Sequence, residues 1–188
     1  MARRAPIALA LVFVSSFVVS IPAITAQANP FGPAIGGGCA EDWCYNENNH
    51  PRIWYANSVT QAWITSLENA RFELNVTTDI NSTTVAAHDN SDWSNYLANY
   101  GNTGWAGITN CMDRNGDICR HWHLRYNTYQ GPFTSLQKQT IGCHEFGHSV
   151  GLFHYGTHQT NPSCMEEGIM HFHQQYNPHD KSHINGYY

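Results

Sequence analysis

Three histidines and one glutamate are spaced in a way that suits metal-assisted hydrolysis. Residues 144–154 read HEFGHSVGLFH. On a helix, His144 and His148 lie on one face about one turn apart, so both imidazoles can bind the same metal ion. Gly151 permits a sharp turn at the end of that helix, and the turn brings His154 round as a third ligand.

The same residues predict a catalytic zinc site rather than a purely structural one. Three protein ligands leave the fourth position of a tetrahedral zinc ion open to water. Glu145 follows His144 and points beside the metal, where its carboxylate can take a proton from that water and later give it to a leaving amine. With the composition of this chain, the whole motif arises by chance about once in 10,000 sequences. An ordinary histidine-rich surface helix is therefore the weaker interpretation.

Three helices are predicted around this motif. The helix that carries it runs from Thr134 or Ser135 to Val150, after the chain-breaking Gly131-Pro132. A short last helix, His179–Asn185, follows Pro178. An earlier helix runs from Ser58 to about Arg71, and its core positions recur at helical spacing: Val59, Trp63, Leu67 and Ala70.

Four segments have the composition of strands: Arg52–Tyr55, Thr83–His88, Gly104–Thr109 and Arg120–Tyr126. In the last of them Trp122, Leu124 and Tyr126 share one face, which predicts a half-buried strand. The polar stretch Asp89–Thr103 is predicted as loop, and Asn115-Gly116 as a hairpin turn. The order of these elements predicts an α+β fold whose sheet lies mostly before the motif-bearing helix.

The first 28 residues predict a signal peptide that is removed on export. A positive start at Arg3 and Arg4 precedes an apolar stretch, and Ala26-Gln27-Ala28 supplies a cleavage site. A membrane anchor is the weaker alternative, because the apolar stretch is short and no stop-transfer segment follows. We therefore expect a secreted chain from Asn29, with an extended segment over 29–50 and one catalytic domain over 51–188.

All six cysteines lie after the expected cleavage site, which predicts three disulfides in an oxidising compartment. Pairing of neighbours along the chain suggests Cys39–Cys44, Cys111–Cys119 and Cys143–Cys164, although the sequence alone allows other connectivities. A zinc site made of cysteines is disfavoured, because the chain has no C-x-x-C pair.

The charge balance argues against nucleic acid as a partner. Nine Lys and Arg against fourteen Asp and Glu give a net charge of −5, and no basic stripe is present to neutralise phosphates. Loss of Arg3 and Arg4 with the signal peptide leaves seven positive residues against fourteen negative ones, or −7. The expected partners are protein or peptide substrates, with no membrane attachment after signal removal, and the length suits one monomeric domain.

Residues 144–154 resemble the signature of metzincin metalloproteases, and the chain looks like the matrixin-like secreted metallopeptidases of bacteria. The resemblance spans residues 50–188, and the residues that match a defined family motif are 144–165. It implies a zincin-type catalytic domain with a mixed twisted sheet, an active-site helix and a loop-rich C-terminal half that ends in a helix. It also implies substrate lying extended across a sheet edge above the zinc, and the candidate edge strand is Arg120–Tyr126.

The resemblance further implies a Met-turn beneath the zinc. Met165 is the better match, because a Cys143–Cys164 disulfide would tie this turn to the active-site helix, and Met170 is the alternative. The family pattern is not complete. Cys39 does not resemble a zinc-blocking propeptide cysteine, and Glu167 stands where a tyrosine ligand of the astacin kind would be.

Other residues give weaker predictions of metal binding. His121 and His123 are expected on the exposed face of a strand, with a second, structural zinc as the alternative. His179 and His183 are four residues apart but make an incomplete site. Residues 113–117 begin like a calcium loop but continue without the glycine and glutamate of an EF-hand, so Ca²⁺ is unsupported as a cofactor.

The sequence thus predicts a secreted zinc endopeptidase with one catalytic Zn²⁺. A non-catalytic, zinc-binding secreted protein is one alternative, although such a protein has no need of Glu145. A non-protease HExxH amidase is another. Peptide deformylases are of this kind, but the Gly-Cys-Leu-type segment that supplies their third ligand is absent here.

Overall fold

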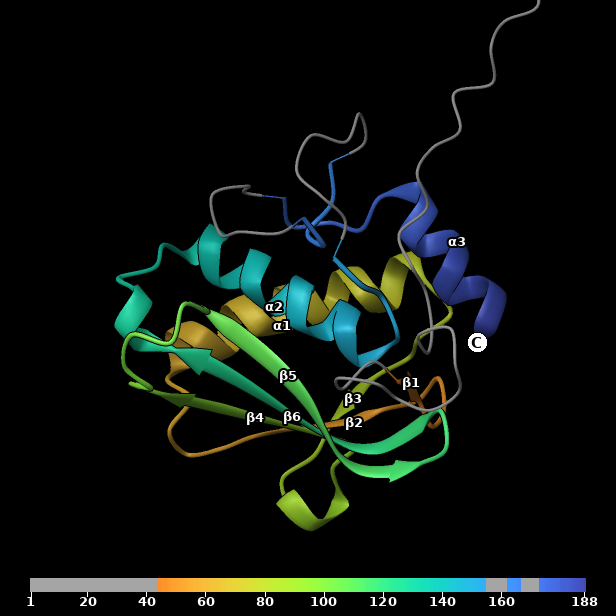
Figure 1. Cartoon of the computed structure of the whole chain (residues 1–188), viewed down its shortest axis with the longest axis horizontal. Coiled ribbons are helices and arrows are strands. Elements are labelled where there is room, and N and C mark those ends of the chain that lie inside the picture. Colours follow the sequence, from red (N-terminus) through yellow and green to blue (C-terminus); the bar gives the residue numbers. More distant parts are fainter. Residues whose placement is uncertain (1–43, 155–161, 167–172) are drawn as a thin grey trace, which may run out of the picture.

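The computed structural model describes residues 44–154, 162–166 and 173–188. Within these residues it is a mixed α+β fold with one mostly parallel sheet and three α-helices, which confirms the predicted fold class at this level (Figure 1). The strands are β1 (Tyr45–Asn46), β2 (Arg52–Tyr55), β3 (Thr83–Thr84), β4 (Trp93–Ala98), β5 (Gly107–Asn115) and β6 (Ile118–Asn127). The helices are α1 (Gln61–Thr77), η2 (His88–Asn90), η3 (Thr128–Gln130), α2 (Ser135–Ser149) and α3 (Pro178–Tyr187).

The sheet has β6 in its interior and β5 at its edge. Parallel pairing gives the order β1-β6-β4-β2-β3, and β5 adds to β6 in antiparallel register. The β5–β6 connection is the predicted hairpin, with Gly116 at a φ of +63°. Because Trp93–Ala98 pairs with one side of β6 and β5 with the other, the prediction of Arg120–Tyr126 as an edge strand is wrong.

The prediction of loop over Asp89–Thr103 is also wrong, because β4 lies within this stretch, between β2 and β6. Its polar residues Ser94 and Asn95 are fully buried. The Asn95 amide donates to the carbonyl of Trp54 at 3.1 Å and accepts from the Tyr126 hydroxyl at 2.8 Å. Polar residues of this kind indicate a loop in the sequence alone. Here, hydrogen bonds to neighbouring strands offset the free-energy cost of burying them.

Two predicted strands are shorter or shifted. Thr83–His88 contains only the two-residue β3, and the chain then enters η2 at His88. Gly104–Thr109 is a strand only from Gly107 onward. The segment before Gly107 is held as a loop by Asn127, whose amide donates to the carbonyls of Gly101 and Trp105 at 2.9 and 3.3 Å.

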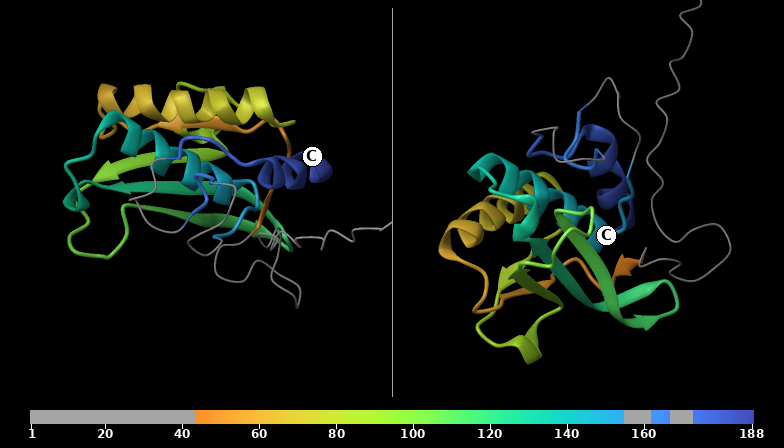
Figure 2. Two further views of the ribbon diagram at one scale, coloured as in Figure 1. Left: turned by 90° about the horizontal axis from the view of Figure 1, so that it is seen from above. Right: turned by 60° about the vertical axis from the view of Figure 1, so that its left-hand side comes forward.

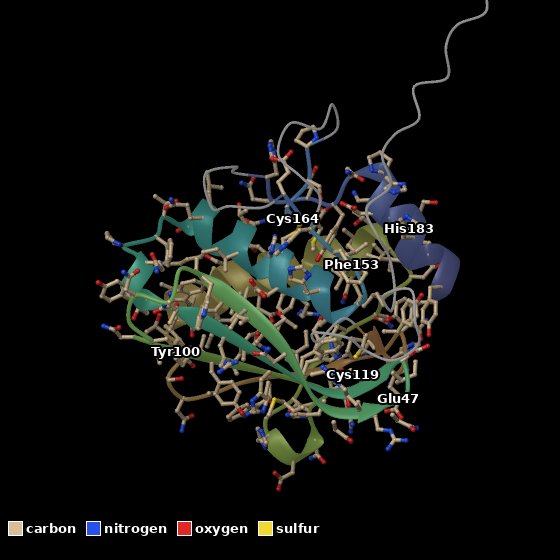
Figure 3. The ribbon with its side chains drawn as sticks, in the orientation of Figure 1. Glu47, Tyr100, Cys119, Phe153, Cys164 and His183 are labelled. Atoms are coloured by element: carbon tan, nitrogen blue, oxygen red, sulfur yellow. A yellow bond between two sulfur atoms is a disulfide. The ribbon has the colours of Figure 1, made fainter. Side chains whose placement is uncertain are left out.

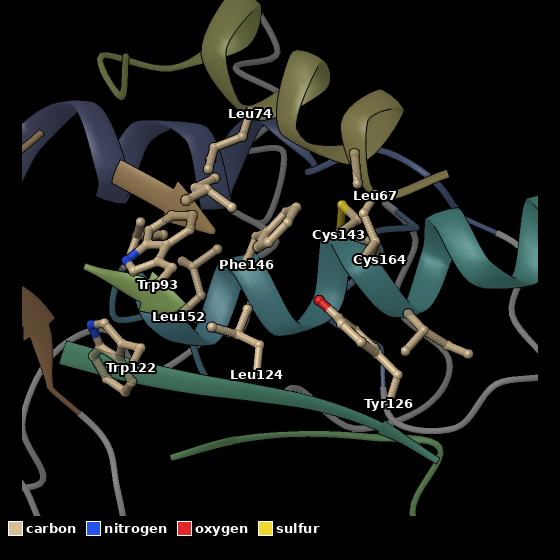
Figure 4. Packing of buried hydrophobic residues seen from close by; sticks show 14 of the residues in the cluster. Leu67, Leu74, Trp93, Trp122, Leu124, Tyr126, Cys143, Phe146, Leu152 and Cys164 are labelled. Carbon is tan, nitrogen blue, oxygen red and sulfur yellow. A yellow bond between two sulfur atoms is a disulfide. The ribbon is translucent and has the colours of Figure 1, made fainter. Parts of the chain in front are cut away.

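Helices α1 and α2 lie side by side on one face of the sheet (Figures 1 and 2). Gly142 permits their close approach, since a Cβ at this position would lie 2.6 Å from the Leu67 side chain. Figure 4 shows Phe146 of α2 among the apolar side chains of this core, with Leu124 and Tyr126 of β6 across from it. The predicted core positions of α1 and its preceding turn are all buried: Val59, Trp63, Leu67 and Ala70.

The helix starts follow local hydrogen bonds. Helix α2 begins at Ser135, one of the two predicted starts, and Thr134 is its N-cap through a capping box with Gln137. In contrast, α1 begins at Gln61, later than predicted, because the Ser58 hydroxyl accepts a hydrogen bond from the Leu97 amide of β4 instead. It also continues past Arg71 to Thr77, where buried Leu74 adds to the core.

Two of the three predicted disulfides are confirmed, Cys111–Cys119 and Cys143–Cys164. The predicted Cys39–Cys44 pair involves Cys39, which lies outside the described residues, as does the predicted signal peptide. Disulfides indicate an extracellular or otherwise oxidising environment. No helix in the described parts of the chain has the length and apolar character needed to cross a membrane.

We expect Cys143→Ala/Cys164→Ala to lower the free energy of unfolding by about 3 kcal/mol, because this disulfide closes a loop of intermediate length in the unfolded chain. The two cysteines are 21 residues apart. Urea unfolding followed by tryptophan fluorescence measures the loss. Removal of the Cys111–Cys119 bond, whose cysteines are only 8 apart, should cost less. An unchanged midpoint in the first variant would contradict this view of the bond.

Candidate metal centre

The structure brings the three predicted ligands together. His144 and His148 lie one turn apart on α2, and Gly151, at a φ of +99°, turns the chain so that His154 approaches them. The Nε2 atom of His144 lies 3.0 Å from that of His148 and 2.8 Å from that of His154. The remaining Nε2–Nε2 separation, between His148 and His154, is 3.1 Å. These atoms can hold a metal ion.

Backbone carbonyls fix the tautomers of two of these rings. The Nδ1 atom of His144 donates to the carbonyl of Cys164, and that of His148 to the carbonyl of Leu152, both at 2.8 Å. Since a carbonyl only accepts, each neutral ring carries its proton on Nδ1 and presents a lone pair at Nε2. His154 can donate a proton to only one of these two lone pairs, whereas a cation between the rings satisfies all three.

Burial keeps the two helix histidines neutral. The pKa of His144 is lowered to about 4, chiefly by burial and also by the neighbouring His154, while the hydrogen bond to the Cys164 carbonyl opposes this shift. The pKa of His148 is also lowered well below its ordinary value, by burial and by His144 and His154. Neutral imidazole is the form that binds metal ions.

Met165 packs beneath the helix that carries the ligands. It is fully buried, and its sulfur lies so close to α2 that a Cβ at Gly147 would be 2.2 Å from it. The disulfide from Cys164 to Cys143 ties this turn to the helix (Figure 4), and Figure 3 shows Cys164 on the side of α2 away from the sheet. The Met-turn at Met165 stays a prediction, and its alternative, Met170, lies outside the described residues.

Glu145 lies against the first residues of β5. Its side chain is 3% exposed, and its Oε2 accepts a hydrogen bond from the Thr109 hydroxyl at 2.7 Å. Gly107 leaves room for the carboxylate, because a Cβ there would lie 2.4 Å from Oε1. Burial raises the pKa of Glu145 to about 8, and the bond from Thr109 opposes this rise.

Sequence reasoning did not single out Thr109 or Gly107 as site residues. They lie about 36 positions from Glu145, and only the pairing of the sheet and the packing of α2 on β5 bring them to it. No local signal marks a lone threonine or glycine of this kind in one sequence.

A cavity of about 310 Å³ opens in front of these groups. His144, Glu145 and His154 contribute to its wall, as do residues of the segment that leads into β5. The full lining is Gly104, Trp105, Ala106, Gly107, Gln130, Thr140, Ile141, His144, Glu145, His154, Cys164 and Glu166. The cavity therefore lies between the sheet edge and the ligand-bearing helix, where an extended chain could reach both.

A second group of histidines comes together elsewhere. His88, His121 and His123 place their ligand atoms within 4.8 Å of one another. The sequence indicated the strand pair but not His88, and both strand histidines are partly buried rather than exposed. Burial lowers the pKa of His123 to about 4, with smaller effects from His121, Arg125 and His88.

The remaining histidine pair forms a contact but no larger group. The Nε2 atoms of His179 and His183 on α3 lie 3.0 Å apart. Among the described residues, this pair is not part of any group of three that could hold a metal ion.

Comparison with known proteins does not identify the function of this site. No protein-family model matches the chain, and no curated protein matches it significantly. Functional inference therefore depends on the motif and on the geometry given above.

Proposed function

We propose that the protein is a secreted zinc endopeptidase of the metzincin type. The observation that carries this proposal is the convergence of three Nε2 atoms beside a buried carboxylate that belongs to none of the ligands. The Met165 turn below α2 and the mostly parallel sheet with one antiparallel edge strand are consistent with it.

The ligand set fits zinc. Neutral imidazoles are ordinary zinc ligands, with Zn–N distances near 2.0–2.1 Å, so a tetrahedral site needs Nε2–Nε2 separations of about 3.3 Å. The observed 2.8 to 3.1 Å requires only a small outward adjustment of the rings. When bound, zinc would activate a water molecule and polarise the peptide carbonyl.

Glu145 would act as the general base and then as the general acid. Thr109 donates to Oε2, which leaves Oε1 to accept a proton from the attacking water and to return it to the leaving amine. A metal cation at the neighbouring histidines would bring the raised pKa of this carboxyl down toward neutrality. Such a pKa suits a group that must both take and give a proton.

The edge strand β5 offers a place for the substrate backbone. Within the described residues β5 pairs only with β6, and its first residue, Gly107, lines the cavity together with Ala106. An extended peptide can add to such an edge through main-chain hydrogen bonds. We therefore assign to β5 the substrate-binding role that the sequence had pointed to in β6.

Hydrolysis of casein or gelatin tests the proposal. The purified protein should cleave these substrates, lose the activity on treatment with a chelator, and regain it when zinc is restored. Binding of zinc without any cleavage would favour the alternative of a non-catalytic metal-binding protein. Cleavage that survives full removal of the metal, or release of only formyl or amide groups from small substrates, would also contradict the assignment.

Thr109 gives a first mutational prediction. We expect Thr109→Val to lower kcat by about tenfold with little change in KM, as for the loss of one hydrogen bond to a charged group. Thr109→Ser keeps the hydroxyl and should restore most of the rate. Steady-state kinetics on a peptide substrate compares the two variants, and equal rates in both would exclude this role of the hydroxyl.

A further inference from the structure

One buried asparagine joins two segments that line the cavity in front of the ligand histidines. Asn127 is the last residue of β6 and is fully buried. Before β5, residues 100–105 form a loop, here called the rim loop, which brings Gly104 and Trp105 to the cavity wall. After β6, the turn η3 brings Gln130 to the same wall. Figure 1 shows the rim loop and η3 at the end of the sheet where β6 ends.

The amide oxygen of Asn127 connects the two segments through their backbones. This Oδ1 accepts a hydrogen bond from the N–H of Tyr100 in the rim loop at 2.9 Å and from that of Tyr129 in η3 at 3.1 Å. The backbone N–H of Asn127 donates to the Ala106 carbonyl at 2.8 Å, where the rim loop leads into β5. One residue therefore holds both ends of the rim loop and caps the start of η3.

The amide nitrogen of Asn127 holds the middle of the rim loop. Its Nδ2 donates to the Gly101 carbonyl and the Thr103 hydroxyl, both at 2.9 Å, and to the Trp105 carbonyl at 3.3 Å. The two protons of the amide are thus shared among three acceptors. In the described parts of the chain, every hydrogen bond that joins the rim loop to a strand or helix is made with Asn127.

These partners require a side chain that both donates and accepts. Backbone N–H groups only donate and carbonyls only accept, so the oxygen of the amide must face Tyr100 and Tyr129 and its nitrogen must face the rim-loop carbonyls. A carboxylate of the same shape would keep the first two bonds but would place a negative charge against the oxygens that Nδ2 now serves. Because Asn127 is fully buried, water does not replace the bonds that such a change removes.

We propose that Asn127 is a positioning residue for substrate binding, which holds the rim loop and η3 in place as parts of one cavity wall. This inference rests on the proposed endopeptidase function. The rim loop leads through Ala106 into the edge strand β5, so a peptide added to that edge would also meet Gly104 and Trp105. Contacts of this kind bind the substrate equally in its ground and transition states, and their loss raises KM and leaves kcat unchanged.

Thr103 gives the first test, because this exposed side chain can lose its hydroxyl without disturbing the core. Thr103→Val removes one acceptor of Nδ2 and should raise KM for a peptide substrate by about fivefold, with kcat and zinc content unchanged. Thr103→Ser keeps the hydroxyl and should have the KM of the wild type. Asn102→Ala is the matched control, because Asn102 is an exposed residue of the same loop that takes no part in these bonds.

Asn127→Asp should raise KM by at least about tenfold and speed the hydrogen exchange of residues 99–106, while α2 exchanges as in the wild type. An unchanged KM in both Thr103→Val and Asn127→Asp, equal losses in Thr103→Val and Thr103→Ser, or a lower kcat at unchanged KM would overturn the proposal. Faster exchange throughout α2 would overturn it too, since it would indicate a general loss of stability. A wild type that cleaves no peptide would instead contradict the proposed function, and the exchange of residues 99–106 would then decide whether Asn127 holds the rim loop.

Discussion

Glu145→Gln should abolish hydrolysis while zinc remains bound. General acid–base catalysis contributes about 10²- to 10⁴-fold to a rate, so we expect kcat on a peptide substrate to fall by at least about 100-fold. The amide introduced by this substitution would keep the shape of the carboxylate but could not accept a proton from water. The zinc content at His144, His148 and His154 should stay near that of the wild type, because Glu145 is not among the grouped ligands.

The fold should tolerate this change. The carboxyl group of Glu145 is buried and its pKa is raised to about 8 by that burial, so a neutral amide removes a group that is costly to ionise. Glu73→Gln is a suitable control, since Glu73 lies on α1 and forms an ion pair with Lys181 at 3.2 Å. Full activity in purified Glu145→Gln would exclude the mechanism, whereas a loss of both zinc and activity would point to disruption of the site.

The sequence predicted those site residues that lie on α2 or in the turn at its end. His144, Glu145 and His148 follow helical spacing, and Gly151 ends the helix by a local backbone preference, at a φ of +99°. Each of these features depends on residues a few positions apart. The start of α2 was likewise predicted to within one residue, because the chain-breaking Gly131-Pro132 and the capping box of Thr134 and Gln137 are both local features.

The parts that were missed depend on contacts between distant strands. Strand β4 carries the polar residues Ser94 and Asn95, which indicate a loop in the sequence alone. In the fold both are buried, and Asn95 forms a hydrogen bond with Trp54 of the neighbouring strand β2. His88 was not recognised because it lies in the connection between β3 and β4, far from His121 in the sequence, and only the fold brings the two rings together. Likewise, the position of β5 at the edge follows from the pairing of β6 on both sides, which no periodicity within β6 reveals.

The two histidine groups share one design and differ in one respect. In both, carbonyl oxygens accept from Nδ1 and direct a bare Nε2 toward other rings, as at His148 and His121. The first group has Glu145 beside it and a cavity in front. The second has serine and tyrosine hydroxyls around it instead. Proton transfer is therefore expected at the first group, where a carboxylate and a cavity lie together.

Gly107→Ala should cost nearly as much activity as the loss of Glu145 itself, although residue 107 bears no functional group. A Cβ at this position would lie 2.4 Å from Oε1 and 2.8 Å from Cδ of Glu145, which is far inside ordinary contact. The carboxylate must then leave its place beside the ligands, and a displacement of about 1 Å lowers a rate by about 100-fold. Zinc content should remain unchanged, since the three atoms nearest to this Cβ all belong to Glu145 and none belongs to a ligand ring.

The matched control for this substitution is Gly186→Ala on α3, where an added Cβ meets no atom within 4 Å. Its kcat should equal that of the wild type. A second variant, Gly107→Ala combined with Glu145→Gln, tests whether the two changes act on the same group: if Gly107 acts only by giving room to the carboxylate, the double variant should be no slower than Glu145→Gln alone. Additive losses would show instead that Gly107 serves the substrate directly, through the backbone of the edge strand β5.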